Sequence, residues 1–159
     1  MRAAILMVAL AFGTVACGPD VDVAKALQLT VVSSGWFDAG IVNGQNKLVP
    51  SATITLTNHS DQTLGLVQVN SLFRQVNATE EWGSAFLPAG GSEGLKPGES
   101  KTLILKSNNG YTGSGETRQE MLKNSHFVDA KVEIFAKYGS TQWKKLGEYP
   151  ITRQLIEKS

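Results

Sequence analysis

The side chains that could perform acid–base or metal chemistry are few and scattered along the chain. The histidines, His59 and His126, are far apart in sequence, whereas a zinc site needs three or four ligands at characteristic spacing. Glu80 and Glu81 are adjacent, so in a strand their carboxylates would point to opposite faces, a poor geometry for an acid–base pair. We therefore expect no catalytic residue, no metal ligand and no cofactor, and we interpret the chain as not an enzyme.

The one thiol in the chain has a more informative position. Cys17 follows Arg2, an apolar run over residues 3–12 and the small residues 13–16. A positive start, a short apolar stretch and a small-residue boundary form the layout of a secretory signal peptide. The apolar run is too short to cross a bilayer core, which needs about 20 residues. The alternative is a buried N-terminal strand or helix.

The sequence TVAC at 14–17 resembles the lipobox of bacterial lipoproteins. The resemblance implies cleavage after residue 16, a diacylglycerol on the sulfur of Cys17, and a further acyl chain such as palmitate on the new amino terminus. Thr14 departs from the pattern, in which leucine is usual. Gly18 stands where an inner-membrane protein of enteric bacteria carries aspartate, so the resemblance implies the outer membrane, facing the periplasm.

The charge and composition of the chain bear on its partners and on its division into domains. The chain has 159 residues, 42 % of them hydrophobic, and its 15 basic residues nearly balance 14 acidic ones. A nucleic-acid-binding domain would carry a basic excess, so we expect no nucleic-acid partner. We divide the chain into a signal peptide (1–16), a short tether (17–25) and one folded domain (26–157).

Short strands separated by turns dominate the predicted domain. Alternation of apolar and polar residues predicts strands within 27–34, 51–58, 65–76, 101–106, 129–138 and 143–155, the first ending at Gly35. Pro150 marks an edge or a break in the last one. The T-x-x-E sequence beginning at Thr117 predicts one short helix over 117–124. The fold class is therefore all-β, an antiparallel immunoglobulin-like β-sandwich of six to eight short strands with one short helix.

Residues 52–74, followed by GLKPGES at 94–100, resemble the immunoglobulin-like FxLYD type of module in bacterial surface proteins. Those modules share an Asn-Ser turn after one strand and a later P-G-E before another. The resemblance covers about half of the predicted domain. It implies a non-catalytic module.

Two aromatic residues are the candidates for binding a ligand or partner. Tyr111 is the only large side chain in the glycine-rich stretch 107–118, and Trp82 lies in the polar segment 79–85. Loops held by a rigid sandwich often carry binding sites. The alternative is structural: Tyr111 folded over a sheet edge, and the tryptophans Trp36, Trp82 and Trp143 used for packing.

Two hypotheses about function follow. The first is a lipid-anchored cell-envelope protein, held in the membrane through Cys17, with a non-catalytic binding or structural role toward an envelope protein or component. The second is a small-ligand carrier or an enzyme on the same anchor, which would need a deep apolar cavity.

Overall fold

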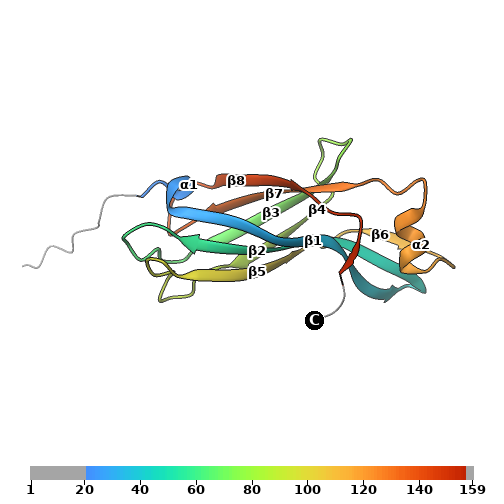
Figure 1. Ribbon diagram of the computed structural model, residues 1–159, viewed down its shortest axis with the longest axis horizontal. Helices are drawn as coiled ribbons and strands as arrows, with labels where there is room; N and C mark the ends of the chain where they lie inside the picture. Colours follow the sequence, from blue (N-terminus) through green and yellow to red (C-terminus); the bar gives the residue numbers. More distant parts are fainter. Residues whose placement is uncertain (1–20, 157–159) are drawn as a thin grey trace, which may run out of the picture.

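Two facing β-sheets form the body of the molecule in the computed structural model, which describes residues 21–156 (Figure 1). The strands are β1 (Leu27–Val42), β2 (Gln45–Asn58), β3 (Gln68–Gln75), β4 (Gly83–Pro88), β5 (Ser100–Lys106), β6 (Tyr111–Gly113), β7 (Ala130–Lys137), β8 (Lys144–Pro150) and β9 (Leu155–Ile156). One sheet has the order β5-β2-β1-β9, with β6 also paired to β2, and the other has the order β4-β3-β7-β8. The predicted β-sandwich is confirmed.

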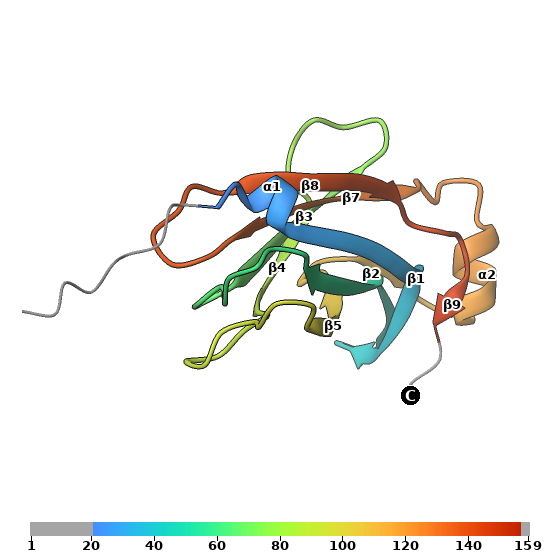
Figure 2. The same cartoon turned by 60° about the vertical axis from the view of Figure 1, so that its left-hand side comes forward.

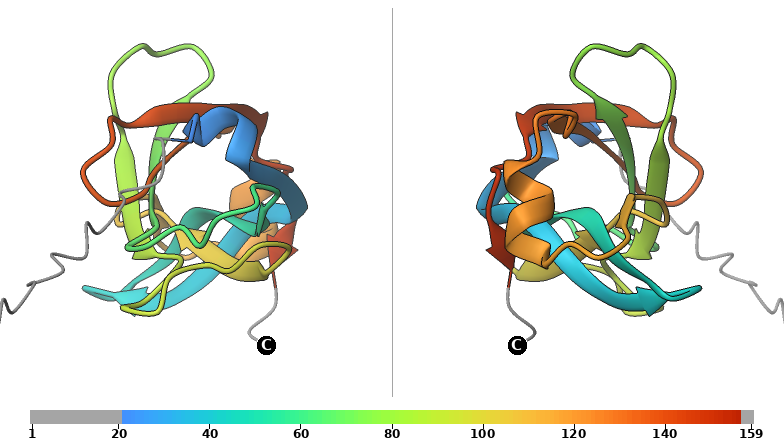
Figure 3. Two further views of the ribbon diagram at one scale, coloured as in Figure 1. Left: turned by 90° about the vertical axis from the view of Figure 1, so that its left-hand side faces the viewer. Right: turned by 90° about the vertical axis from the view of Figure 1, so that its right-hand side faces the viewer.

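The core lies between the sheets and is built from the residues that alternate along each strand. On β2 the side chains of Ala52, Ile54 and Leu56 are fully buried, whereas the intervening threonines are half-buried. On β7 every second residue, from Ala130 to Ala136, is fully buried in the same way. Seen along the long axis, the two sheets enclose this core (Figure 3). Period-two burial is what the sequence pattern predicted.

The first strand is longer than the sequence pattern indicated. We expected it to end at Gly35, but β1 continues to Val42, with register shifts after Val31 and Asp38. Gly35 is instead the place where β9, the last of the described strands, approaches. A Cβ atom there would lie 2.8 Å from both the carbonyl oxygen of Gln154 and a side-chain carbon of Ile156. The glycine therefore permits the parallel pairing of β9 with β1 (Figure 2).

Part of the predicted tether packs against the sandwich. Helix α1 (Val23–Ala26) begins with the carboxylate of Asp22 accepting a hydrogen bond from the amide of Ala24, and its residues Val23 and Ala26 are buried. Val21 also packs against the core. The described chain is thus already attached to the body at residue 21, ahead of the predicted domain boundary at 26. Cys17 and the predicted signal segment lie outside the described residues.

The predicted helix is confirmed as α2 (Arg118–Lys123), and its capping box is complete. The hydroxyl of Thr117 accepts from the amide of Glu120, whose carboxylate accepts from the amide of Thr117. Two helices and nine strands are present in residues 21–156, against one helix and six to eight strands predicted. None of the described helices has the length and apolar character needed to span a membrane.

Candidate binding surfaces

Four aromatic rings from distant parts of the chain meet at the α2 end of the sandwich. We call Trp36, Trp82, Tyr111 and Phe127 the aromatic cluster. The ring centroids of Trp36 and Phe127 lie 4.5 Å apart, and those of Tyr111 lie 4.9 Å from Trp82 and 4.6 Å from Phe127. The guanidinium of Arg153 lies 5.1 Å from the Phe127 ring centroid. Both residues predicted to bind a partner, Tyr111 and Trp82, are thus brought together in one packed cluster.

Three hydrogen bonds fix the hydroxyl of Tyr111. It accepts from the side-chain amide of Gln75 at 2.8 Å and from the backbone N–H of Val128 at 3.1 Å, and it donates to the carbonyl of Val128 at 3.2 Å. Its backbone belongs to β6, which pairs with β2 through Leu48. The stretch 107–118 was expected to be a loop, but it contains this strand. Tyr111 is therefore packed against the body, as in the alternative in which it folds over a sheet edge, and only part of the residue is exposed.

Trp36 is the fully buried centre of the aromatic cluster. Its indole N–H has no nitrogen or oxygen partner within the described residues. The rings of Trp82, Tyr111 and Phe127 surround it, and Phe127 meets it edge to face. The groups around it are aromatic rings, which accept from N–H groups only weakly.

A cavity of about 200 Å³ adjoins the aromatic cluster beside α2. We call it the α2 cavity. It is lined by Tyr111, Thr112, Glu116, Met121, Asn124, His126 and Phe127. Its walls are held in place: the side-chain amide of Asn124 donates to the carboxylate of Glu116 at 2.9 Å, and that of Asn46 donates to the Glu116 carbonyl. The lining combines aromatic rings, a thioether, an amide, a carboxylate and an exposed imidazole.

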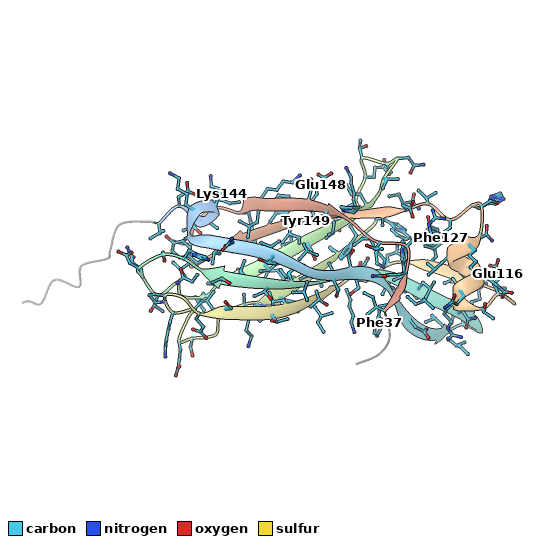
Figure 4. The ribbon with its side chains drawn as sticks, viewed as in Figure 1. Phe37, Glu116, Phe127, Lys144, Glu148 and Tyr149 are labelled. Atoms are coloured by element: carbon cyan, nitrogen blue, oxygen red, sulfur yellow. The ribbon has the colours of Figure 1, made fainter. Side chains whose placement is uncertain are left out.

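The α2 cavity lies at one end of the long axis, and the described chain begins at the other. Figure 4 places Phe127 and Glu116 at the α2 end and Lys144 at the α1 end. Val21 is fixed at the α1 end by Tyr138, whose hydroxyl accepts from the Val21 amide at 2.7 Å and donates to its carbonyl at 3.0 Å.

A second aromatic surface lies on the outer face of the β4-β3-β7-β8 sheet. Phe86 and Trp143 are 56 % and 37 % exposed, and their ring centroids lie 6.2 Å apart in an edge-to-face arrangement. The ammonium of Lys137 lies 5.1 Å from the Trp143 ring centroid. We call Phe86, Lys137 and Trp143 the outer aromatic patch. Phe135 lies on this same face, opposite Asn70.

Ion pairs cover the same sheet face nearer the α2 end. The carboxylate of Glu133 binds Arg74 at 2.8 Å and Lys145 at 2.6 Å, and Glu148 binds Lys145 at 2.8 Å and Lys131 at 3.0 Å. Hydrogen bonds from Lys145 and then Lys131 lower the pKa of Glu148 to about 2, and those from Lys145 and Arg74 lower the pKa of Glu133. The Lys145 pKa is raised by the same contacts.

The remaining candidates for chemistry are apart from one another. His59, His126, Glu80 and Glu81 are all exposed in turns or loops. Residues 90–94 read G-x-S-x-G, a pattern found at the nucleophile of many hydrolases. In those enzymes the serine lies on a sharp turn between a strand and a helix. Here Ser92 lies in an exposed turn followed by the isolated bridge of Leu95 and then β5. Within residues 21–156 there is no group of three metal-ligating side chains.

Comparison with known proteins gives distant likenesses of structure alone. No family model and no curated protein sequence matches the chain. The solution structure of AT1g01470 from Arabidopsis thaliana is 14 % identical, with a TM-score of 0.46, covering 82 % of this chain and 83 % of that one. The ligand binding region of Serine-glutamate repeat protein A of Enterococcus faecium is 12 % identical, with a TM-score of 0.35, covering 83 % and 98 %. These likenesses concern the fold alone.

Proposed function

We propose that this chain is a lipid-anchored protein of the cell envelope with a non-catalytic binding role, held in the membrane through acyl chains on Cys17. The signal-like segment and the lipobox-type TVAC sequence support the anchor. Three acyl chains on one residue hold a protein far more firmly than one, which binds only reversibly. The partner is a protein or another component of the envelope.

The observation that carries the binding role is the position of the α2 cavity. An anchor at Cys17 keeps the α1 end near the membrane, because only three residues separate Cys17 from the fixed residue Val21. The four steps along the backbone from Cys17 to Val21 extend at most about 14 Å. The opposite end, where Phe127 and Glu116 lie, then faces away from the lipid and toward other envelope molecules (Figure 4).

The size and rigidity of the cavity favour a protein contact over a carried small molecule. Pockets that enclose drug-sized ligands occupy about 300–1,000 Å³, whereas this one has about 200 Å³. That volume suits one side chain inserted by a partner. Since Tyr111 and Glu116 are already held by hydrogen bonds, little ordering is required when a partner binds.

Photo-crosslinking in cells tests this binding role. A photoreactive amino acid replaces His126, which is exposed on the rim of the α2 cavity, and in a matched variant it replaces Glu93, which is exposed in the β4–β5 connection. We expect a discrete crosslinked protein from position 126 and none from position 93. Equal products from both positions, or none from 126, would contradict the proposal.

Metabolic labelling tests the anchor separately. We expect radioactive palmitate to be incorporated into the native chain, and Cys17→Ser to release the protein from membranes without changing its melting temperature. Density-gradient separation of the two membranes tests the outer-membrane location implied by Gly18. A serine variant that still sediments with membranes would contradict the anchor.

A further inference from the structure

The outer aromatic patch is unusual for the surface of a folded domain. Within the described chain, Phe86 and Trp143 are the most exposed aromatic residues, at 56 % and 37 %, and their rings meet edge to face. Both rings stand on paired strands or immediately beside them, so the patch is part of a rigid sheet. Contiguous exposed aromatic side chains on a rigid surface indicate a contact site.

The patch is close to the point where the chain leaves the body toward Cys17. The β7–β8 connection begins with Tyr138, whose hydroxyl holds both the amide and the carbonyl of Val21, and it ends with Trp143. Lys144, the next residue, lies beside α1 in the side-chain view (Figure 4). With three residues between Val21 and Cys17, a lipid on Cys17 would be attached within about 14 Å of this connection.

The chemistry of the patch is that of side chains at a membrane surface. Tryptophan is enriched at the boundary between acyl chains and headgroups, and lysine favours anionic headgroups. Lys137 lies over the Trp143 ring, and Lys144 is exposed beside it. The acids on the same face, Glu133 and Glu148, are already engaged by Arg74, Lys131 and Lys145, so they repel anionic lipid less than free carboxylates would.

We propose that the outer aromatic patch docks on the surface of the lipid bilayer that holds the anchor, with Phe86 and Trp143 entering the headgroup region. This inference rests on the proposed lipid anchor. It adds an orientation: the α1 half of the β4-β3-β7-β8 sheet lies against the membrane, and the body tilts so that the α2 cavity stays free. The anchor alone would leave the body free to rotate.

Fluorescence quenching by lipid tests the docking. The full-length processed protein is purified from membranes and reconstituted in vesicles of phosphatidylethanolamine and phosphatidylglycerol, with and without brominated acyl chains. We expect brominated lipid to quench a component of the tryptophan emission. That component should be lost in Trp143→Phe, which keeps an apolar ring, and retained in Trp82→Phe, which removes a tryptophan at the α2 end. Melting temperatures of both variants check that the fold is kept.

The outcomes separate this inference from the proposed function. The mass of the N-terminal peptide from the same preparation reports acylation of Cys17. An acylated protein whose emission is quenched equally in the native chain and in Trp143→Phe overturns the docking alone. A chain without acyl groups overturns the anchor and the docking together. Protection of Trp143 from acrylamide in the absence of lipid, rising with protein concentration, would identify a second copy as the occupant and also overturn the docking.

Discussion

The hydroxyl of Tyr138 binds both the N–H and the C=O of Val21, at 2.7 and 3.0 Å. One side chain of the β7–β8 connection thus forms hydrogen bonds with both backbone polar groups of the first described residue, 117 positions earlier in the chain. Through this pair the segment leading to Cys17 is attached to the body.

Removing that hydroxyl should loosen α1. We expect Tyr138→Phe to lower the free energy of unfolding by about 1–2 kcal/mol, since two partly buried hydrogen bonds are lost. Hydrogen exchange of the amides in residues 21–26 should increase more than exchange in β7. Tyr149→Phe is the matched control, because the Tyr149 hydroxyl has no hydrogen-bond partner in the described part of the chain. Unchanged exchange at 21–26 would show that other contacts hold α1.

The buried side chain of Asn58 connects two turns through hydrogen bonds. It is fully buried; its amide donates to the carbonyls of Gln62 and Leu95, and its oxygen accepts from Ser60. We expect Asn58→Ala to destabilise the fold by about 3 kcal/mol, because these groups would be left buried without partners. Urea unfolding measures the effect. Asn70→Ala, at a half-exposed position on the outer sheet face, should change stability by less than about 0.5 kcal/mol.

Gly110 is required by a close backbone contact. A Cβ atom at this position would lie 2.0 Å from the carbonyl oxygen of Leu48, so Gly110→Ala must push β6 away from β2. We expect a loss of about 2–4 kcal/mol, within the range of severe single substitutions, together with increased exposure of Tyr111. Gly91→Ala is the control, since open space surrounds that position. Similar melting temperatures for the two variants would contradict this account.

Acid should weaken the ion-pair cluster on the outer sheet face. The folded-state pKa values of Glu133 and Glu148 are depressed below 4.5, so both carboxylates release their protons more readily in the folded protein. Their contribution to stability is therefore complete above about pH 4.5 and is lost as the pH falls toward 2. We expect the urea midpoint to fall between pH 6 and pH 3, and to fall less in Glu133→Gln. In Glu93→Gln, an exposed site without an ion pair among the described residues, the decrease should match that of the native chain.

The two faces of β2 should respond differently to a new charge. Ile54 is fully buried, so Ile54→Asp places a carboxylate without a partner in the core and should unfold the domain. Thr55 points to the other face, where its hydroxyl lies 3.4 Å from that of Thr102, and Thr55→Asp should be tolerated. Circular dichroism of both variants measures this. Equal loss of structure in the two variants would contradict the assignment of one buried and one exposed face to β2.

Local patterns predicted the sandwich well where burial follows the strand period. The alternation at Ala52, Ile54 and Leu56 predicted which face of β2 is buried, and the T-x-x-E sequence at Thr117 predicted where α2 begins. Both features depend on neighbours a few residues away. Such neighbours are visible in the sequence itself.

Features that depend on distant segments were not predictable in the same way. Gly35 was interpreted as the end of a strand, but it is small because β9 approaches it from the far end of the chain. The glycines of 107–118 suggested a loop, although Gly110 is there for its close contact with β2. The aromatic cluster joins rings from four separate segments, so only the fold reveals that Tyr111 and Trp82 touch.

The pairing of β9 with β1 also matters during synthesis of the chain. The amide of Trp36, the largest fully buried side chain, donates to the carbonyl of Gln154, so β1 cannot complete this contact until the chain has been synthesised past residue 154. A product that stops before Gln154 has an open strand edge beside its central tryptophan, and such edges recruit other chains. Chains that stop before Gln154 should therefore aggregate rather than behave as a slightly weakened monomer.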